Sequence, residues 1–235
     1  MVILNSSSIN TKNKTMYAYE LISDAIPPVR TSDTIQKVTE RMAEFRVNHL
    51  PIVNDKQFLG LISDEDLIQS ADLTFPIGGL SLSLYNPFVF QDQHVYDVIR
   101  LFYEQKLSIV PVLDVNKNYK GLISINTMME HVATITSVKE PGSIIILEIS
   151  NRNNSLSHIA QIVESDNAQI LSSYVKSFPD STRLEVTLKL NRADISSILA
   201  SFLRYDYNVK ATFNDTKSDD GTSDRYNQLM NYLDI

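Results

Sequence analysis

A repeat within the chain limits its fold more than any other feature of the sequence. Pro27 and Pro51 recur 60 residues later as Pro87 and Pro111, and the apolar and polar residues around the two pairs follow the same order. After one extra residue in the second copy, the segment "GLIS" that begins at Gly60 also recurs. We therefore expect two copies of one structural unit in succession.

Each copy combines helical and strand-like patterns. Four apolar residues per copy follow the spacing of one helix face. They are Ile35, Val38, Met42 and Phe45 in the first copy and Val95, Val98, Ile99 and Phe102 in the second. The order of patterns predicts a strand-like start, a helix, two strands around a polar turn and a second helix, which is expected at about 64–71 in one copy and 126–133 in the other.

A different pattern follows the repeat. The segment Pro141–Ser143 breaks the chain, after which strand, helix, two strands, helix and strand patterns succeed one another over 143–213. This β-α-β-β-α-β order predicts a ferredoxin-like split βαβ unit.

Composition and turn residues suggest where the units begin and end. Pro76, Gly78 and Gly79 mark a linker between the copies. The expected organisation is a disordered leader at 1–15, a first copy at 16–73, a linker at 74–84, a second copy at 85–138, the third unit at 143–213 and a flexible tail at 214–235.

Charge and residue usage exclude several classes of function. The 235 residues carry 28 acidic and 21 basic side chains, and the resulting net charge of −7 repels nucleic acid and anionic membrane surfaces. The longest apolar run, Ile144–Ile149, is far shorter than the roughly 20 residues of a membrane span. Because the chain has no cysteine, it forms no disulfide, and a cytoplasmic location is expected.

The repeat closely resembles a tandem pair of cystathionine-β-synthase (CBS) domains. The residues that carry the resemblance are "HLPIV" with "FLGLISDEDL" in the first copy and "SIVPVLD" with "YKGLISINTMM" in the second, and the likeness spans about 17–132. The resemblance implies a cleft between the two units that binds an adenine nucleotide of the AMP, ADP or ATP type. It also implies that a Ser/Thr-x-x-Asp motif contacts the ribose.

Ser63 and Asp66 match that ribose motif in the first copy. In the second copy Ser124 is kept, but Thr127 stands where the acid would be. The further nucleotide contacts that the resemblance implies are Leu61, Leu122, Pro27, Pro87, Val47 and Leu107. Two alternatives stay open, because Ser63 and Asp66 also suit a helix cap and the apolar residues also suit the hydrophobic core.

The third unit resembles an ACT domain, a small-ligand regulatory module. The carrying segment is "NRNNSLSHI", and the candidate ligand contacts are Asn151, Asn154 and Gln169. Asn154 replaces the glycine of the usual ACT signature, and the missing glycine weakens any amino-acid site. The expected fold is thus α+β, with a tandem CBS pair followed by a ferredoxin-like (ACT-like) domain, which is similar to acetoin-utilisation-type CBS proteins.

No set of residues in the sequence forms a catalytic or metal-binding pattern. The four histidines, His49, His94, His131 and His158, lack metal-ligand spacing. We therefore expect a non-catalytic regulatory protein that senses an adenine nucleotide, requires no cofactor or metal, forms a homodimer or higher homo-oligomer, and acts on a protein partner. The alternatives are a structural or interaction module with no bound nucleotide, and an amino-acid sensor that uses the ACT-like domain.

Overall fold

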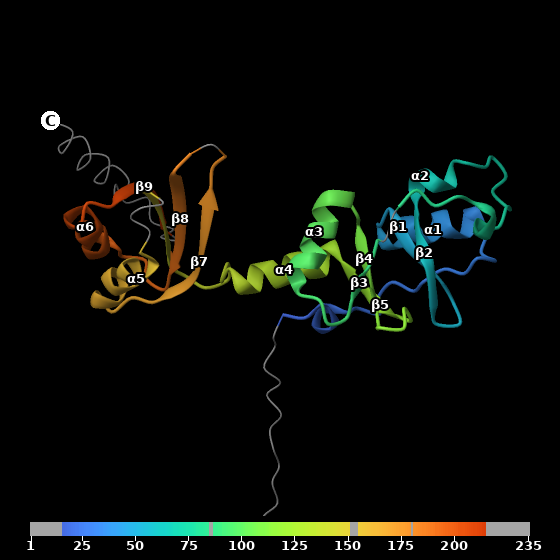
Figure 1. Ribbon diagram of the computed structural model, residues 1–235, viewed down its shortest axis with the longest axis horizontal. Helices are drawn as coiled ribbons and strands as arrows, with labels where there is room; N and C mark the ends of the chain where they lie inside the picture. The colour runs from blue at the N-terminus through green and yellow to red at the C-terminus, as the bar shows by residue number, and fades with distance from the viewer. Residues whose placement is uncertain (1–15, 85–86, 151–154, 180, 215–235) are drawn as a thin grey trace, which may run out of the picture. The chain divides into compact units, whose positions relative to one another are not determined.

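The computed structural model describes residues 16–84, 87–150, 155–179 and 181–214 (Figure 1). The chain divides into two compact units, Met1–His131 and Val132–Ile235. Each unit is described by itself below.

The first repeat forms a two-stranded antiparallel sheet with helices around it. Its elements are α1 (Ile35–Phe45), β1 (His49–Asn54), β2 (Gln57–Ser63) and α2 (Asp64–Leu67). Val29, in the strand-like start, pairs in parallel with Ile52 of β1. Helix α1 buries Ile35, Val38 and Met42, as its spacing predicts.

The second repeat has the same order. Its elements are β3 (Val89–Phe90), α3 (Val95–Gln105), β4 (Ile109–Leu113), β5 (Tyr119–Ser124) and α4 (Ile125–Ile135). Strand β3 pairs in parallel with β4, which pairs antiparallel with β5. The predicted succession of strand, helix, two strands and helix is therefore confirmed in both copies.

The closing helices of the two copies differ in length from the expected ones. Helix α2 ends at Leu67 instead of continuing to residue 71, whereas α4 extends from Ile125 to Ile135. After α2, the Ser70 hydroxyl accepts a hydrogen bond from the Asp72 N–H, and the Asp72 carboxylate accepts one from the Thr74 N–H. Such side chains offer the backbone an alternative to the helix, which explains the early end of α2.

The segment that precedes each repeat packs on the other repeat. Before the first repeat, the short 3₁₀ helix Ala18–Leu21 begins with an N–H that donates to the Gln93 carbonyl at 2.8 Å. Before the second repeat, the 3₁₀ helix Ile77–Gly79 begins with an N–H that donates to the Asp33 carbonyl at 2.9 Å. The predicted linker, 74–84, is thus hydrogen-bonded to the first repeat.

The repeated glycine permits these crossings. A Cβ added to Gly60 would lie 2.2 Å from Leu82 Cδ1, and a Cβ added to Gly121 would lie 2.4 Å from Ile22 Cγ2. Gly121 also has a φ of 142°, a backbone conformation that favours glycine. The "GLIS" repeat therefore reflects a packing requirement as well as a strand.

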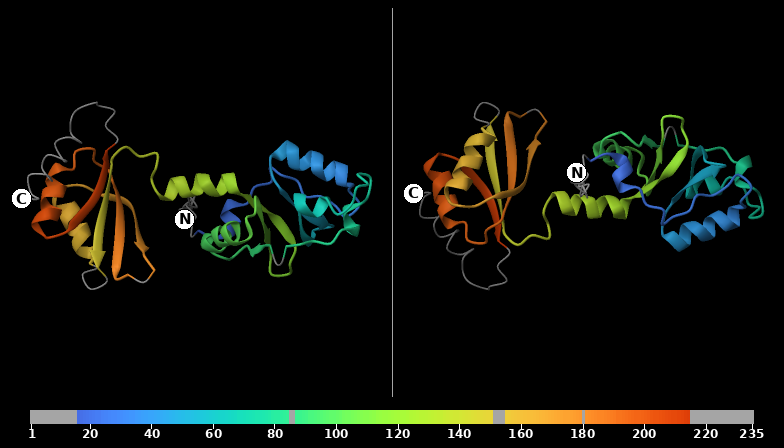
Figure 2. Two further views of the ribbon diagram at one scale, coloured as in Figure 1. Left: turned by 90° about the horizontal axis from the view of Figure 1, so that it is seen from above. Right: turned by 90° about the horizontal axis from the view of Figure 1, so that it is seen from below.

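The second unit is a four-stranded antiparallel sheet with both helices on one face (Figures 1 and 2). The strand order is β7-β8-β6-β9. Its elements are β6 (Ser143–Ser150), α5 (Leu156–Ser165), β7 (Ile170–Ser177), β8 (Arg183–Leu190), α6 (Ser196–Arg204) and β9 (Asn208–Asn214). This order and connectivity confirm the predicted ferredoxin-like, ACT-like fold.

The alternation of β6 shows how this sheet forms its core. Ile145, Leu147 and Ile149 are buried on the face that α5 and α6 cover, and the residues between them are half-buried on the other face. Phe202 of α6 is fully buried against these strands. The hydrophobic core of the second unit is thus made by residues of that unit.

Candidate functional site

Ser63 and Asp66 form a capping box at the start of α2. The Ser63 Oγ accepts a hydrogen bond from the Asp66 N–H at 3.1 Å, and the Asp66 Oδ2 accepts one from the Ser63 N–H at 2.9 Å. Ser63 is only 4% exposed and Asp66 only 2% exposed. The capping role expected for these residues is therefore present, and it uses both of them.

The second carboxylate oxygen of Asp66 reaches beyond its own helix. Asp66 Oδ1 accepts a hydrogen bond from the Ser83 N–H at 3.1 Å, so the carboxylate ties α2 to the segment that leads into the second repeat. A carboxylate offers about four acceptor positions, and the described contacts occupy two of them. Two acceptor positions of Asp66 are thus without a described hydrogen bond, and the residue is only 2% exposed.

The matching position of the second repeat is uncharged. The hydroxyls of Ser124 and Thr127 lie 2.9 Å apart, and the Thr127 N–H donates to the Ser124 Oγ at 3.1 Å. Both residues are half-buried. The two repeats therefore present different chemistry at equivalent positions, a carboxylate in one and a pair of hydroxyls in the other.

The two repeats meet at Asn48 and Ser108, which are equivalent residues 60 positions apart. The Asn48 N–H donates to the Ser108 Oγ at 3.0 Å, and the Ser108 N–H donates to His49 Nδ1 at 3.1 Å. Sequence reasoning did not identify Ser108, although its equivalence to Asn48 was visible in the repeat. These contacts join the start of β1 to the start of β4.

Burial lowers the pKa of His49, which is 8% exposed. The carboxylates of Asp64, Asp66 and Glu65 oppose this effect without overcoming it. The neutral imidazole is therefore favoured in the folded protein, with Nδ1 as the acceptor for the Ser108 N–H.

The apolar candidates lie mostly in the core. Leu61 and Leu122 are fully buried in their strands, and Val47, Leu107 and Pro87 are also buried. Pro27, in contrast, is exposed. The structure brings Ser63 together with Asp66 and Ser124 together with Thr127, and it leaves the nucleotide contacts of all ten candidates as predictions.

Two cavities lie in the first repeat. A groove of about 640 Å³ between α1 and α2, called the α1–α2 groove below, is lined by residues that include Ile35, Met42, Val47, Leu67, Ile68 and Leu73. A second cavity of about 750 Å³, called the basic pocket below, is lined by residues that include Pro27, Arg30, Asp33, Lys37, Arg41, Asp55 and Lys56. Val47 and Pro27 thus line different cavities.

The candidate ligand contacts of the ACT-like domain are described only in part. Asn151 and Asn154 lie outside the described residues. Gln169 is exposed, and its backbone pairs with Asn191: the Gln169 N–H donates to Asn191 Oδ1 at 2.8 Å, and the Asn191 N–H donates to the Gln169 carbonyl at 3.1 Å. An amino-acid site in this domain stays a prediction.

The described ranges hold neither a cluster of metal-ligating side chains nor a membrane-spanning helix. They contain no group of three or more His, Cys, Asp or Glu side chains placed to hold a metal ion. None of the helices in these ranges has the length and apolar composition needed to cross a membrane.

Several solved structures are similar to this chain. A CBS domain pair/ACT domain protein from Thermotoga maritima is 24% identical over 50% of this chain and 96% of its own, with a TM-score of 0.46. CBSX2 in complex with AMP is 20% identical over 53% and 98% of the two chains, with a TM-score of 0.44. The acetoin utilization protein AcuB from Vibrio cholerae is 15% identical over 52% and 94%, with a TM-score of 0.45.

The family model of the CBS domain matches residues 18–72 and residues 84–134. These two matches coincide with the two copies of the repeat, each of which has the same order of strands and helices. Residues 18–134 of the chain therefore contain a tandem pair of CBS domains, and this pair is followed by a ferredoxin-like, ACT-like domain.

Proposed function

We propose that the CBS pair binds an adenine nucleotide in the cleft between its two repeats and that Ser63 and Asp66 contact the ribose. CBS domain proteins generally bind adenine nucleotides in regulatory roles, and they are typically non-catalytic. This chain is accordingly proposed to be a regulatory protein of the cytoplasm that requires no cofactor. Ligand binding shifts such a protein between two states by binding one of them more tightly.

The observation that carries this proposal is the carboxylate of Asp66. A ribose offers two neighbouring hydroxyl donors, and a carboxylate is the acceptor that binds such donors most strongly. Asp66 is buried beside the start of α2, and its two described hydrogen bonds leave acceptor positions free. The second repeat has the neutral pair Ser124 and Thr127 at this position, so we propose one nucleotide per chain.

Calorimetric titration with AMP tests this proposal. The informative variant is Asp66→Asn, because asparagine keeps an oxygen for the Ser63 N–H and removes the negative charge, although its amide nitrogen cannot accept the hydrogen bond from the Ser83 N–H. Loss of a charge-assisted hydrogen bond of about 1.5–3 kcal/mol is expected to weaken AMP binding by roughly tenfold or more. The matched control is Thr127→Ala, which changes the equivalent position of the second repeat and should leave the affinity within about twofold.

Two results would contradict the proposal. One is the absence of AMP, ADP or ATP binding to ligand-free wild-type protein at millimolar concentration. The other is an equal affinity of wild type and Asp66→Asn when thermal unfolding shows that both are folded. Either result would favour a structural or interaction module, in which Ser63 and Asp66 act only as a helix cap.

The α1–α2 groove favours a second role, homodimer formation. Its wall is largely apolar, and Ile68 and Leu73 are 83% and 55% exposed there. Exposed apolar residues gathered at one groove are typical of an interaction surface. We therefore propose that a second copy of this chain packs against the groove, whether or not the cleft holds a nucleotide.

A further inference from the structure

The basic pocket lies beside α1 in the first repeat, and Ser63 and Asp66 do not line it. Three segments form its wall: residues 27–33, the side of α1 that carries Lys37 and Arg41, and the turn between β1 and β2. Its volume of about 750 Å³ is within the range of small-molecule sites.

The wall of the basic pocket has an excess of positive charge. The cationic side chains are those of Arg30, Lys37, Arg41 and Lys56, and the carboxylates are those of Asp33 and Asp55. This local excess contrasts with the net charge of −7 of the whole chain. The basic pocket therefore attracts anions, although the chain as a whole repels them at long range.

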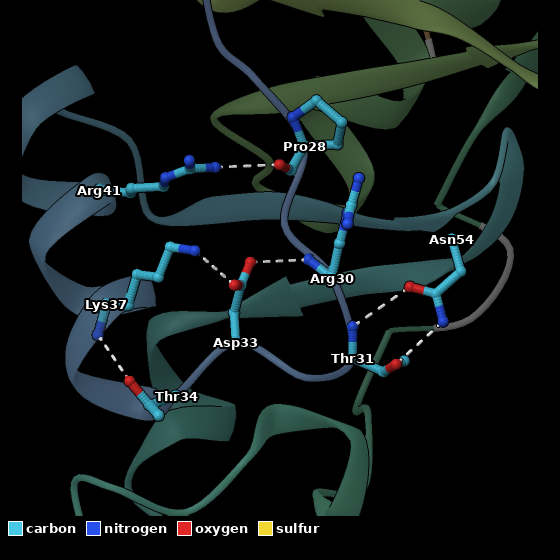
Figure 3. A network of polar contacts seen from close by, with 8 residues as sticks. All are labelled: Pro28, Arg30, Thr31, Asp33, Thr34, Lys37, Arg41 and Asn54. Carbon is cyan, nitrogen blue, oxygen red and sulfur yellow. Dashed lines mark hydrogen bonds and ion pairs between the residues drawn. The ribbon is translucent and has the colours of Figure 1, made fainter.

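Internal contacts already satisfy one of the two carboxylates (Figure 3). Asp33 accepts hydrogen bonds from Lys37 Nζ at 2.5 Å and from the Arg30 N–H at 2.9 Å. Burial alone would raise the pKa of Asp33, but these hydrogen bonds and the charges of Lys37 and Arg41 outweigh it and lower the pKa. Asp33 thus stays charged and holds Lys37 at the pocket wall.

The other cations are positioned by the backbone. Arg41 Nη1 donates a hydrogen bond to the Pro28 carbonyl at 3.0 Å (Figure 3). This bond holds the guanidinium group of Arg41 against the segment 27–33, which also carries Arg30. Lys56 lies in the turn between β1 and β2, and its backbone carbonyl accepts a hydrogen bond from the Tyr119 N–H at 2.8 Å. Within the described part of the chain, the side chains of Arg30 and Lys56 make no hydrogen bond or ion pair, so both remain available to a ligand.

The second repeat shows that the fold does not need these charges. At the positions equivalent to Arg30, Lys37 and Arg41 it has Phe90, Asp97 and Leu101. It nevertheless forms the same turn before its helix, where neutral Gln93 Oε1 accepts from the Phe90 N–H at 2.7 Å as Asp33 accepts from the Arg30 N–H. Arg30, Lys37 and Arg41 are therefore additions to a fold that forms without them, whereas Lys56 has Lys117 at the equivalent position of the second repeat.

We propose that the basic pocket binds the phosphate groups of a small polyphosphorylated anion. Guanidinium groups match the geometry of phosphate oxygens, and lysine ammonium groups add charge. Four cations spread over a cavity of this size suit several linked phosphates better than a single one. Free polyphosphate and the phosphates of a nucleotide share this chemistry.

Titration of the full chain with inorganic tripolyphosphate tests the proposal by calorimetry at low ionic strength. Wild type is expected to bind one tripolyphosphate, and Arg30→Gln/Lys56→Gln is expected to bind it about tenfold more weakly, because two charge-assisted contacts are lost. The matched control is Arg100→Gln/Lys117→Gln, which removes the same charge from the second repeat and should keep the wild-type affinity.

Several outcomes are decisive. Absence of wild-type binding at millimolar tripolyphosphate, or equal weakening in both double variants, would overturn the proposal. Thermal unfolding confirms that each variant is folded. The Asp66→Asn variant should bind tripolyphosphate as wild type does. A failure of the phosphate proposal can therefore be told apart from a failure of the ribose proposal. Competition by ATP would support nucleotide phosphates as the ligand, and tripolyphosphate binding without such competition would support free polyphosphate.

Discussion

Asp66 contributes to two structures at once, since one carboxylate oxygen caps α2 and the other holds the Ser83 N–H. Replacing Asp66 by alanine would therefore remove a cap, worth about 0.5–2 kcal/mol, together with any ligand contact. The capping box also means that the pairing of Ser63 with Asp66 is explained by the helix start alone. Only a charge-specific loss of nucleotide binding can separate the two roles, which is why Asp66→Asn is the sharper variant.

His49 predicts a pH dependence of stability at the residue scale. Its pKa is lowered in the folded protein because burial disfavours the charged imidazole. The unfolded chain therefore binds more protons than the folded one as the pH falls below the ordinary histidine pKa of about 6.5. The stabilisation by neutral His49 is present above that pH, and it is lost as the pH falls toward and through the lowered pKa.

Chemical denaturation of wild type and His49→Gln between about pH 8 and pH 5 measures this effect. Glutamine keeps an acceptor near the Ser108 N–H but does not titrate. We expect the free energy of unfolding to fall more steeply with decreasing pH in wild type than in His49→Gln. Parallel curves for wild type and His49→Gln would show that His49 is not the group responsible.

At the scale of elements, the crossing of the lead-in segments explains the repeated glycines. Gly60 and Gly121 occupy equivalent strands and face Leu82 and Ile22 of the two crossing segments. The two positions differ in one respect, because Gly121 has a φ of 142° whereas the obstacle at Gly60 is the end of a flexible leucine side chain. A methyl group should therefore be tolerated better at Gly60.

We predict that Gly121→Ala destabilises the CBS pair by about 1–3 kcal/mol, because it combines backbone strain with a clash against the β-branched Ile22. Gly60→Ala serves as the matched control and should cost clearly less, since Leu82 can change its rotamer. Urea denaturation of the two variants and wild type provides the comparison. A larger loss of stability in Gly60→Ala would mean that the crossing of 74–84 is the more rigid of the two.

For the whole molecule, the main question is how the chain associates. The CBS pair and the ACT-like domain each bury their own set of hydrophobic residues. The α1–α2 groove nevertheless leaves Ile68 and Leu73 exposed. Burying them against another copy would remove this apolar surface from water.

Light scattering at micromolar concentration is expected to give a mass of at least about twice the 26.6 kDa of one chain. Ile68→Glu should shift the protein toward the monomer, because a carboxylate cannot be buried in an apolar interface without a partner. The control Val115→Glu changes a residue of similar exposure, 74%, in the turn between β4 and β5, and it should not change the mass. A wild-type mass near 26.6 kDa would rule out the proposed dimer under these conditions.

The sequence by itself determined the elements and their order. The 60-residue spacing of the prolines predicted two equivalent units, and the alternation and helical spacing in 143–213 predicted β-α-β-β-α-β. These patterns are readable because they arise from periodicities within one strand or one helix. For the same local reason, the cap at Ser63 could be predicted from the residues that follow it.

Contacts between distant residues were decided by the tertiary structure alone. Packing of the linker on the first repeat brings the Ser83 N–H to Asp66, and packing of the two repeats brings Ser108 to His49. Packing within the first repeat likewise brings the turn at Lys56 beside Arg30 in the basic pocket. The early end of α2 also depends on the turns that follow it. No periodicity in the sequence records such contacts, because they depend on how separate elements pack in space.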